Sequence, residues 1–385
     1  MSETPDRQVT GVCVFAALHG PGLGDLVQRN IMLALIRRAH PHARVTLVVG
    51  EELAARFAEL FAAHTYATDV LTCPPDEAHP RWPAFLRTLA GRRYERCVID
   101  PDSAALHAGH ALAAGIPDRI GLPLGRPGDE HITRPLRLPP PVWGRPDLFD
   151  HATALAGALG LPGRLRAGQL VPDLPRRPGP ARPARPASAG PVVAVHPGGA
   201  PHWNRRWPPS RYADLCVRLA TRRSAALRLL GTAPERAELR ALRDTVRAGA
   251  PGADVRVETG ADLNRTANLL AGADLLVGND SALAHLAAAV RTPSVVIYGP
   301  TGTEFLWTRI YPHHRGVSLR WPCQSLLHAP GRLEDRRCAH DCVLPYRGPE
   351  GPYPRCLTAL PVERVWAAVT AQLASSPPAT IRSTP

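Results

Sequence analysis

The sequence predicts an α/β protein with two doubly wound, Rossmann-like units, and three observations point to this fold class. Short β-type runs alternate with longer helical patterns in the first half of the chain. Residues 172–191 then carry seven prolines in twenty positions. The alternation resumes after them. Alternating strands and helices predict parallel sheets with helices on both faces.

In the first half, the hydrophobic pattern predicts each element in turn. Strands are expected at residues 12–18, 44–49 and 95–99, and another strand is expected to end at Cys73. Helical periodicity covers residues 25–39, 51–62 and 103–114. We expect these elements to form an N-terminal domain over residues 1–172.

The proline density predicts an interdomain linker over residues 173–191, because proline interrupts both helices and sheets. After it, strands are expected at residues 192–195, 226–230, 275–277 and 294–298, and helices at 208–221, 234–247, 262–271 and 281–290. These elements predict a second domain over residues 192–360. A helix over residues 361–374 and a disordered tail over 375–385 complete the prediction.

The charge balance does not indicate a nucleic-acid partner. The chain has 46 basic residues against 33 acidic ones, a net charge of +13, and none of the basic residues is lysine. The arginines are scattered and form no basic tail, so a compositional origin in a GC-rich genome is favoured over a binding face. Without lysine, a lysine Schiff base and a P-loop are excluded.

The length and the chain start indicate the class of protein. A chain of 385 residues suits two domains better than one core. No apolar run reaches 18 residues, so no transmembrane helix is expected. The polar start, Met1 to Thr10, does not resemble a signal peptide. We therefore expect a cytoplasmic protein.

The first motif with chemical potential is HGPGLGD, residues 19–25, at a strand-to-helix turn. Gly22 and Gly24 allow a ligand to approach the backbone, but the spacing does not fit a dinucleotide-binding G-x-G-x-x-G. Asp25 has two interpretations. It is either a first-turn acid that suits the helix dipole or a general base at the carboxyl edge of the sheet.

The second motif is HPGGAPHWNRRWP, residues 196–208. After His196, Gly198 and Gly199 expose backbone N–H groups to an anion, and Arg205 or Arg206 could complete a phosphate clamp. An ordinary loop with surface arginines is the alternative.

A third motif, GNDSALAHLAAA, places Asp280, Ser281 and Ala282 at a helix start, where anions bind readily. His285 follows on the same helix and either donates to a phosphate or sugar oxygen or packs in the core. In the weaker fourth motif, GTAPERAE, Glu235 opens a helix. It either holds ribose hydroxyls or compensates the helix dipole.

Four of the eight cysteines cluster in an irregular segment: Cys323, Cys338, Cys342 and Cys356. Four thiolates in such a loop suggest structural zinc or iron, with free thiols and disulfides as alternatives. Cys13, Cys97 and Cys216 are expected in the core, because they lie within predicted strands and helices.

Together the motifs resemble the ADP-heptose:lipopolysaccharide heptosyltransferase family, glycosyltransferase family 9. The segments GLGDLVQRNIMLALIRRAHPHARVTLVV, HPGG followed by RRWPPSRYADL, and NDSALAHLAAAVRTPSVVIYGPT are similar to the family's motifs and occur in its order. The resemblance implies a GT-B fold, with an acceptor-binding first domain and a nucleotide-sugar-binding second domain. It also implies inverting transfer without a catalytic metal.

The resemblance also implies roles for individual residues. Asp25 matches the proposed general base on the acceptor hydroxyl, and Glu235 matches a ribose-contacting glutamate. Donor contacts are implied for Asp280, Ser281 and His285. Arg205 replaces the family's usual lysine, and Ser281-Ala282 replace Thr-Gly.

The resemblance leaves the sugar, nucleotide and acceptor open. A heptose or related hexose from an ADP-sugar is expected, with GDP or UDP as alternatives. The acceptor is either lipopolysaccharide core, an antibiotic-type natural product in a GC-rich host, or a protein such as an autotransporter adhesin. Some family members that modify proteins carry cysteine-bound iron, but through paired C-x2-C motifs that this chain lacks. A non-catalytic sugar-nucleotide-binding protein is the remaining class.

Overall fold

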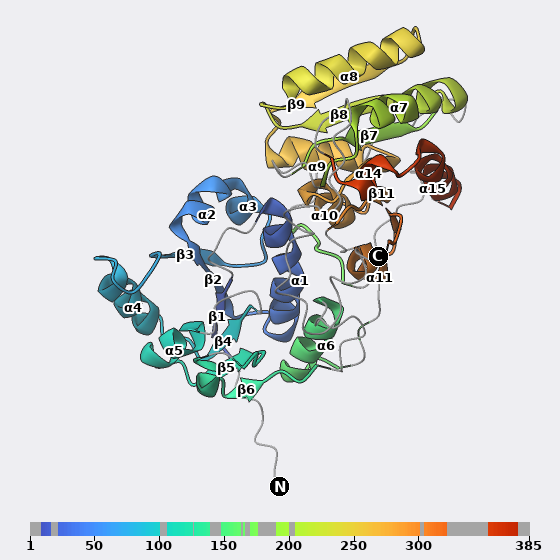
Figure 1. Cartoon of the computed structure of the whole chain (residues 1–385). Coiled ribbons are helices and arrows are strands. Elements are labelled where there is room, and N and C mark those ends of the chain that lie inside the picture. Colours follow the sequence, from blue (N-terminus) through green and yellow to red (C-terminus); the bar gives the residue numbers. More distant parts are fainter. Residues whose placement is uncertain are drawn as a thin grey trace. The chain divides into compact units, whose positions relative to one another are not determined.

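The chain forms two compact units, each described by itself. The computed structural model describes residues 9–16, 22–100, 106–125, 127–138, 148–162, 165, 170–175, 190–199, 205–300, 304–321 and 353–375. Unit 1 comprises Met1–Pro141, Pro146–Arg166 and Pro172–Arg176, and unit 2 comprises the remainder, mainly Arg177–Pro385. Figure 1 shows a sheet with flanking helices in each unit.

Unit 1 is a six-stranded parallel sheet with the order β3-β2-β1-β4-β5-β6. Its strands are β1 (Gly11–Phe15), β2 (Arg44–Gly50), β3 (Asp69–Cys73), β4 (Arg96–Ile99), β5 (Asp118–Gly121) and β6 (Arg134–Pro135). Its helices are α1 (Leu23–Ala39), α2 (Glu51–Arg56), α3 (Ala58–Ala63), α4 (Trp82–Gly91), α5 (Leu106–Ala113) and α6 (Leu148–Ala158), with a 3-10 turn, η1, at Asp129–His131.

The core of unit 1 follows from strands that are apolar on both faces. Phe15 in β1 and Ile99 in β4 are buried together with Trp82, Phe85 and Leu89 of α4 in one cluster. On α1, apolar residues at helical spacing are buried, including Leu26, Val27 and Ile31. Burial of each such side chain stabilises the fold by about 1.5–3 kcal/mol.

Unit 2 has the same architecture, with the strand order β12-β11-β10-β7-β8-β9. Its strands are β7 (Val192–His196), β8 (Ala226–Gly231), β9 (Val255–Thr259), β10 (Leu275–Asn279), β11 (Ser294–Ile297) and β12 (His314–Val317). Its helices are α7 (Pro209–Arg223), α8 (Arg236–Gly249), α9 (Leu263–Ala271), α10 (Ala282–Ala289), α11 (Glu304–Ile310), α14 (Arg355–Thr358) and α15 (Val362–Ser375).

One large core in unit 2 lies between the sheet and the layer formed by α7, α8 and α15. It joins Val195 and Val277 of the sheet to Tyr212 of α7, Val246 of α8 and Val365 of α15, all fully buried. Helices α9 and α10 contact each other, and α10 also contacts β10 and β11 (Figure 1). The predicted doubly wound arrangement is therefore confirmed in both units.

Several boundaries differ from the sequence prediction. Helix α1 begins at Leu23, two residues earlier than expected, so Gly24 lies inside its first turn and not in a loop. The helix predicted over residues 51–62 is two helices, because the backbone of Phe57 leaves the helical region at φ −120° and ψ 31°. The final helix extends from Val362 to Ser375.

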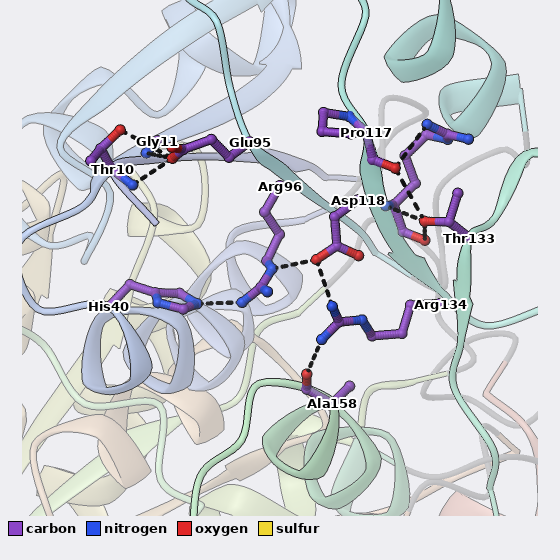
Figure 2. Close-up of polar contacts among 11 residues, drawn as sticks. Thr10, Gly11, His40, Glu95, Arg96, Pro117, Asp118, Thr133, Arg134 and Ala158 are labelled. Atoms are coloured by element: carbon purple, nitrogen blue, oxygen red, sulfur yellow. Dashed lines mark hydrogen bonds and ion pairs between the residues drawn. The ribbon is translucent and has the colours of Figure 1, made fainter. Parts of the chain in front are cut away.

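Polar side chains connect the first residues of strands β4, β5 and β6 in unit 1 (Figure 2). Arg96, the first residue of β4, donates to Asp118, the first residue of β5, over 2.7 Å and lies 2.6 Å from His40 Nε2. Arg134, the first residue of β6, also pairs with Asp118, at 3.0 Å. These contacts therefore stabilise the amino edge of the sheet.

The candidate residues lie at the opposite, carboxyl edge. In both sheets the strand order reverses direction at the centre, between β1 and β4 in unit 1 and between β7 and β10 in unit 2. Ligands of doubly wound sheets bind beside the carboxyl ends of strands at this switch point. No helix in the described part of the chain is long and apolar enough to cross a membrane.

Candidate functional site

Asp25 lies beyond the carboxyl end of β1, in the first turn of α1, and its side chain is exposed. Its Oδ2 accepts a hydrogen bond of 2.8 Å from the N–H of Gly22. This contact agrees with the expected helix-capping role. It leaves the second carboxylate oxygen and the solvent-facing side of the group for a proton-transfer role.

A buried ion pair contacts the first turn of α1. Arg29 of α1 and Asp100, which follows β4, are both buried. Two guanidinium nitrogens of Arg29 lie 2.7 and 3.0 Å from the two carboxylate oxygens of Asp100. Arg29 Nη1 also donates to the backbone carbonyl of Asp25 over 2.9 Å. The switch point of unit 1 therefore anchors the backbone that carries Asp25, a feature that the sequence analysis missed.

In unit 2, His196 is the last residue of β7 and is buried. Its Nδ1 lies 2.9 Å from the carbonyl oxygen of Leu230, which can only accept, so Nδ1 carries a proton. Burial lowers the pKa of His196, although the bond to Leu230 and the carboxylate of Glu235 oppose this. The imidazole is therefore neutral near pH 7 and its Nε2 is a hydrogen-bond acceptor.

Glu235, which precedes α8, lies beside the β7 turn and occupies the space that a side chain at position 198 would need. A Cβ on Gly198 would lie 2.1 Å from Glu235 Oε1 and 3.0 Å from a ring carbon of His196. A side chain at position 198 would therefore force the Glu235 carboxylate to move. The sequence analysis placed both residues in the site but could not show this contact.

The carboxylate of Glu235 is held by donors on two sides. The backbone N–H and the hydroxyl of Thr232 each donate to Oε2 over 2.8 Å, and Arg206 lies 3.3 Å from Oε1. Burial raises the pKa of Glu235, but the bonds from Thr232 and the charge of Arg206 outweigh it, and the pKa falls below its usual value. Glu235 is therefore an ionised acceptor at neutral pH.

The two arginines of the second motif differ in their surroundings. Arg206 also contacts Glu238, at 3.4 Å, and donates to the carbonyl of Gly199 over 3.2 Å. In the part of the chain that the structure describes, no ion-pair partner is found for Arg205, which is half-buried. The guanidinium of Arg206 thus already binds other groups of the protein, and Arg205 is the better candidate for binding an anionic ligand.

Asn279, the last residue of β10, connects the second motif to the third. It is 1% exposed. Its Oδ1 accepts from the backbone N–H of Trp207 and from the hydroxyl of Tyr212, and its Nδ2 donates to the carbonyls of Pro197 and Gly198. The sequence analysis missed this role, because an asparagine beside Gly and Asp also suits a solvent-exposed turn.

Helix α10 begins at the same edge of the sheet. Ser281 is its N-cap residue, with Ala282 first in the helix and Asp280 buried just before it. The Ser281 hydroxyl makes no cap hydrogen bond, and within the described residues its buried oxygen has no partner. An unsatisfied hydroxyl beside free helix N–H groups suits an anionic ligand.

His285 lies within α10 and is buried against aromatic residues. Its ring packs edge-on against Trp307 at a centroid distance of 4.5 Å, and its Nδ1 lies 2.8 Å from the hydroxyl of Tyr311. These contacts agree with the interpretation of His285 as a residue packed in the core. Its expected donor contact remains a prediction.

The cysteine cluster falls largely outside the described residues. Cys323, Cys338 and Cys342 are not described, and Cys356 lies in α14, buried in the core of unit 2. No group of three or more metal-ligating side chains occurs among the residues that the structure describes. The metal site stays a prediction. Cys13, Cys97 and Cys216 are fully buried, as expected.

Residues 84–334 match the sequence profile of glycosyltransferase family 9 (heptosyltransferase). A segment of 115 residues is 31% identical to lipooligosaccharide heptosyltransferase 2 of Haemophilus influenzae and covers 30% of this chain and 33% of that protein. The chain therefore matches about a third of the length of this relative.

Solved structures resemble the whole chain. The E. coli ADP-heptose LPS heptosyltransferase II has a TM-score of 0.62 at 20% identity, over 95% of this chain and 98% of that one. The E. coli heptosyltransferase WaaC with ADP-2-deoxy-2-fluoro heptose has a TM-score of 0.58 at 18% identity, over 85% and 98%. These likenesses confirm the predicted GT-B fold class. Because the family profile covers more than half of the chain, the protein belongs to glycosyltransferase family 9, the heptosyltransferase family.

Proposed function

We propose that this protein transfers a heptose or related hexose from a nucleoside-diphosphate sugar, foremost ADP-heptose, to an acceptor hydroxyl. The observation that carries the proposal is the arrangement at the carboxyl edge of the unit 2 sheet, next to the switch point. There the ionised Glu235, the neutral His196 and the side-chain-free Gly198 meet at the ends of β7 and β8.

This arrangement supports recognition of a nucleoside. Glu235 and the Nε2 of His196 are acceptors, which suit the two hydroxyls of a ribose. Gly198 leaves room for a ligand to approach the backbone. The same edge carries the N-terminus of α10, where the Ser281 hydroxyl and the N–H of Ala282 suit a diphosphate.

The proposed chemistry is inverting and needs no catalytic metal. The acceptor hydroxyl attacks C1 of the sugar and loses its proton to Asp25, while the C1–O bond to the diphosphate breaks. The negative charge that develops on the diphosphate is stabilised by Arg205 and the start of α10. One such contact contributes about 3–4 kcal/mol to transition-state stabilisation.

Two acceptor classes are favoured by separate observations. The names of the family relatives favour a lipopolysaccharide or lipooligosaccharide core. The lysine-free, arginine-rich composition also fits a GC-rich, actinomycete-like host without lipopolysaccharide, in which an antibiotic-type natural product would be the acceptor. Neighbouring genes would separate them, because core-assembly genes and modular synthetase genes do not share a cluster. A cytoplasmic location is part of this proposal, since nucleotide sugars are made there.

Mass spectrometry of the ligand retained from cells, followed by turnover with ADP-, GDP- and UDP-sugars, tests the proposal. Release of the nucleoside diphosphate from one of these donors would support it. Absence of both transfer and donor hydrolysis across the panel, with a nucleotide still bound, would instead support a binding protein.

A further inference from the structure

The amide of Asn279 holds two parts of the chain that are separate in sequence. Nδ2 donates to the carbonyls of Pro197 and Gly198, at 2.7 and 3.0 Å. Oδ1 accepts from the N–H of Trp207 at 3.0 Å. One side chain thus binds the backbone on both sides of the segment between Gly199 and Arg205.

A second contact joins the same two parts of the chain. Arg206 donates to the carbonyl of Gly199 over 3.2 Å. Trp207 is 1% exposed, and its Nε1 donates to the carbonyl of Leu360 over 3.1 Å, so the end of the segment is also fixed from the core side. Arg205 therefore directly precedes a point at which the chain is anchored, at Arg206 and Trp207.

Only a primary amide fits this position. Asn279 needs two N–H donors for the two carbonyls and an acceptor for Trp207 and Tyr212, and an amide supplies both. An aspartate would keep the acceptor but face both carbonyls with an oxygen. A leucine would leave buried backbone groups unsatisfied, at a cost of about 1–3 kcal/mol for each group.

We propose that Asn279 is a positioning residue that sets the place of Arg205 at the diphosphate site. This inference rests on the proposed function, in which Arg205 binds the diphosphate of the donor. Asn279 acts by holding Pro197, Gly198 and Trp207 in one geometry.

A double-mutant cycle of Asn279→Asp and Arg205→Ala tests the inference. The measured quantity is the Kd of ADP from titration calorimetry, or the Kd of GDP or UDP if one of them binds more tightly. Each single substitution should weaken binding about tenfold, because a charge-assisted hydrogen bond is lost or misplaced. In the Arg205→Ala background, Asn279→Asp should weaken nucleotide binding by less than about threefold, because the effects of interacting residues are not additive. Asn279→Ser provides a second variant if the aspartate prevents folding.

Tyr212→Phe is the matched control, since it removes one bond to Asn279 but none to the segment. It should lower the melting temperature and leave the Kd unchanged. Equal Asn279→Asp factors in both Arg205 backgrounds would overturn the inference, as would a matching loss in Tyr212→Phe. A wild-type protein that binds none of the three nucleotides would overturn the proposed function itself.

Discussion

At the scale of single residues, Gly198 lies against the carboxylate of Glu235. An added Cβ would lie 2.1 Å from Glu235 Oε1 and 2.7 Å from its Cδ, so the carboxylate must move. Gly198→Ala should therefore weaken nucleoside-diphosphate binding about tenfold, because the charge-assisted bonds of the carboxylate are lost. Calorimetric titration with ADP measures this. Gly91→Ala, with no atom within 4 Å of its new Cβ, is the control. Equal affinities in the two variants would contradict the assigned role of Glu235.

Sequence reasoning located most of the site at this scale, since glycines, acids and histidines follow strands at the edge where ligands bind. The residue pattern alone left Arg205 and Arg206 open, and only the family resemblance favoured Arg205. That choice depends on the contact of Arg206 with Glu235, 29 residues away. Sequence reasoning also missed Asn279, whose partners come from Pro197, Gly198, Trp207 and Tyr212. Such long-range pairings leave no local pattern.

At the scale of elements, the first turn of α1 depends on the buried pair Arg29 and Asp100. Arg29→Met should lower the free energy of unfolding by about 3–5 kcal/mol, because the buried carboxylate of Asp100 loses its guanidinium partner. It should also lower kcat, since Arg29 holds the carbonyl of Asp25. Urea unfolding and steady-state kinetics measure the two effects.

Arg96→Met is the matched control for that variant. Arg96 is also buried and paired, but at the amino edge of the same sheet (Figure 2). Arg96→Met should lower the free energy of unfolding, by less than Arg29→Met because Arg134 still pairs with Asp118, and should leave kcat unchanged. A similar fall of kcat in both variants would show that the Arg29 pair contributes stability alone.

The elements that the sequence predicted are those with strong apolar patterns, such as β1, β2, β7 and α7. The missed strands are β5, β6, β9 and β12. Strands β6, β9 and β12 are at sheet edges, where β9 is mostly half-exposed and β12 reads HRGV, and β5 reads DRIG, with two charged residues in four. Edge strands need few apolar residues, so their pattern is weak. Helix α4 was also missed, because its opening Trp-Pro resembles a turn.

At the scale of the whole molecule, buried neutral histidines predict acid sensitivity. Burial, and secondarily the nearby His285, lower the pKa of His314 to about 3. Its ring nitrogens contact Ser294 and Tyr298, at 2.9 and 2.8 Å. The pKa of His314 is depressed in the folded state. The contribution of the neutral, buried imidazole to stability is therefore complete above pH 6.5 and is lost as pH falls toward 3.

Between these limits, each unit by which pH falls should lower the free energy of unfolding by about 1.4 kcal/mol, because the unfolded state binds a proton at His314 and the folded state does not. Urea unfolding at pH 7 and pH 5 of the wild type and of His314→Gln measures the difference. The variant should be less stable at pH 7 but lose less on acidification. An unchanged pH dependence in His314→Gln would mean that His314 is not the residue responsible.

The central claim for the whole molecule is that Asp25 removes the acceptor proton while unit 2 holds the donor. The most direct test is transfer by Asp25→Asn, with the donor and acceptor on which the wild type is active. Glu51→Gln is the control, since Glu51 is another acid in the first turn of a helix of unit 1. The account predicts that Asp25→Asn lowers kcat by about 10²–10⁴-fold with the Kd of the donor unchanged, because a general base is lost. Wild-type kcat in Asp25→Asn would contradict it.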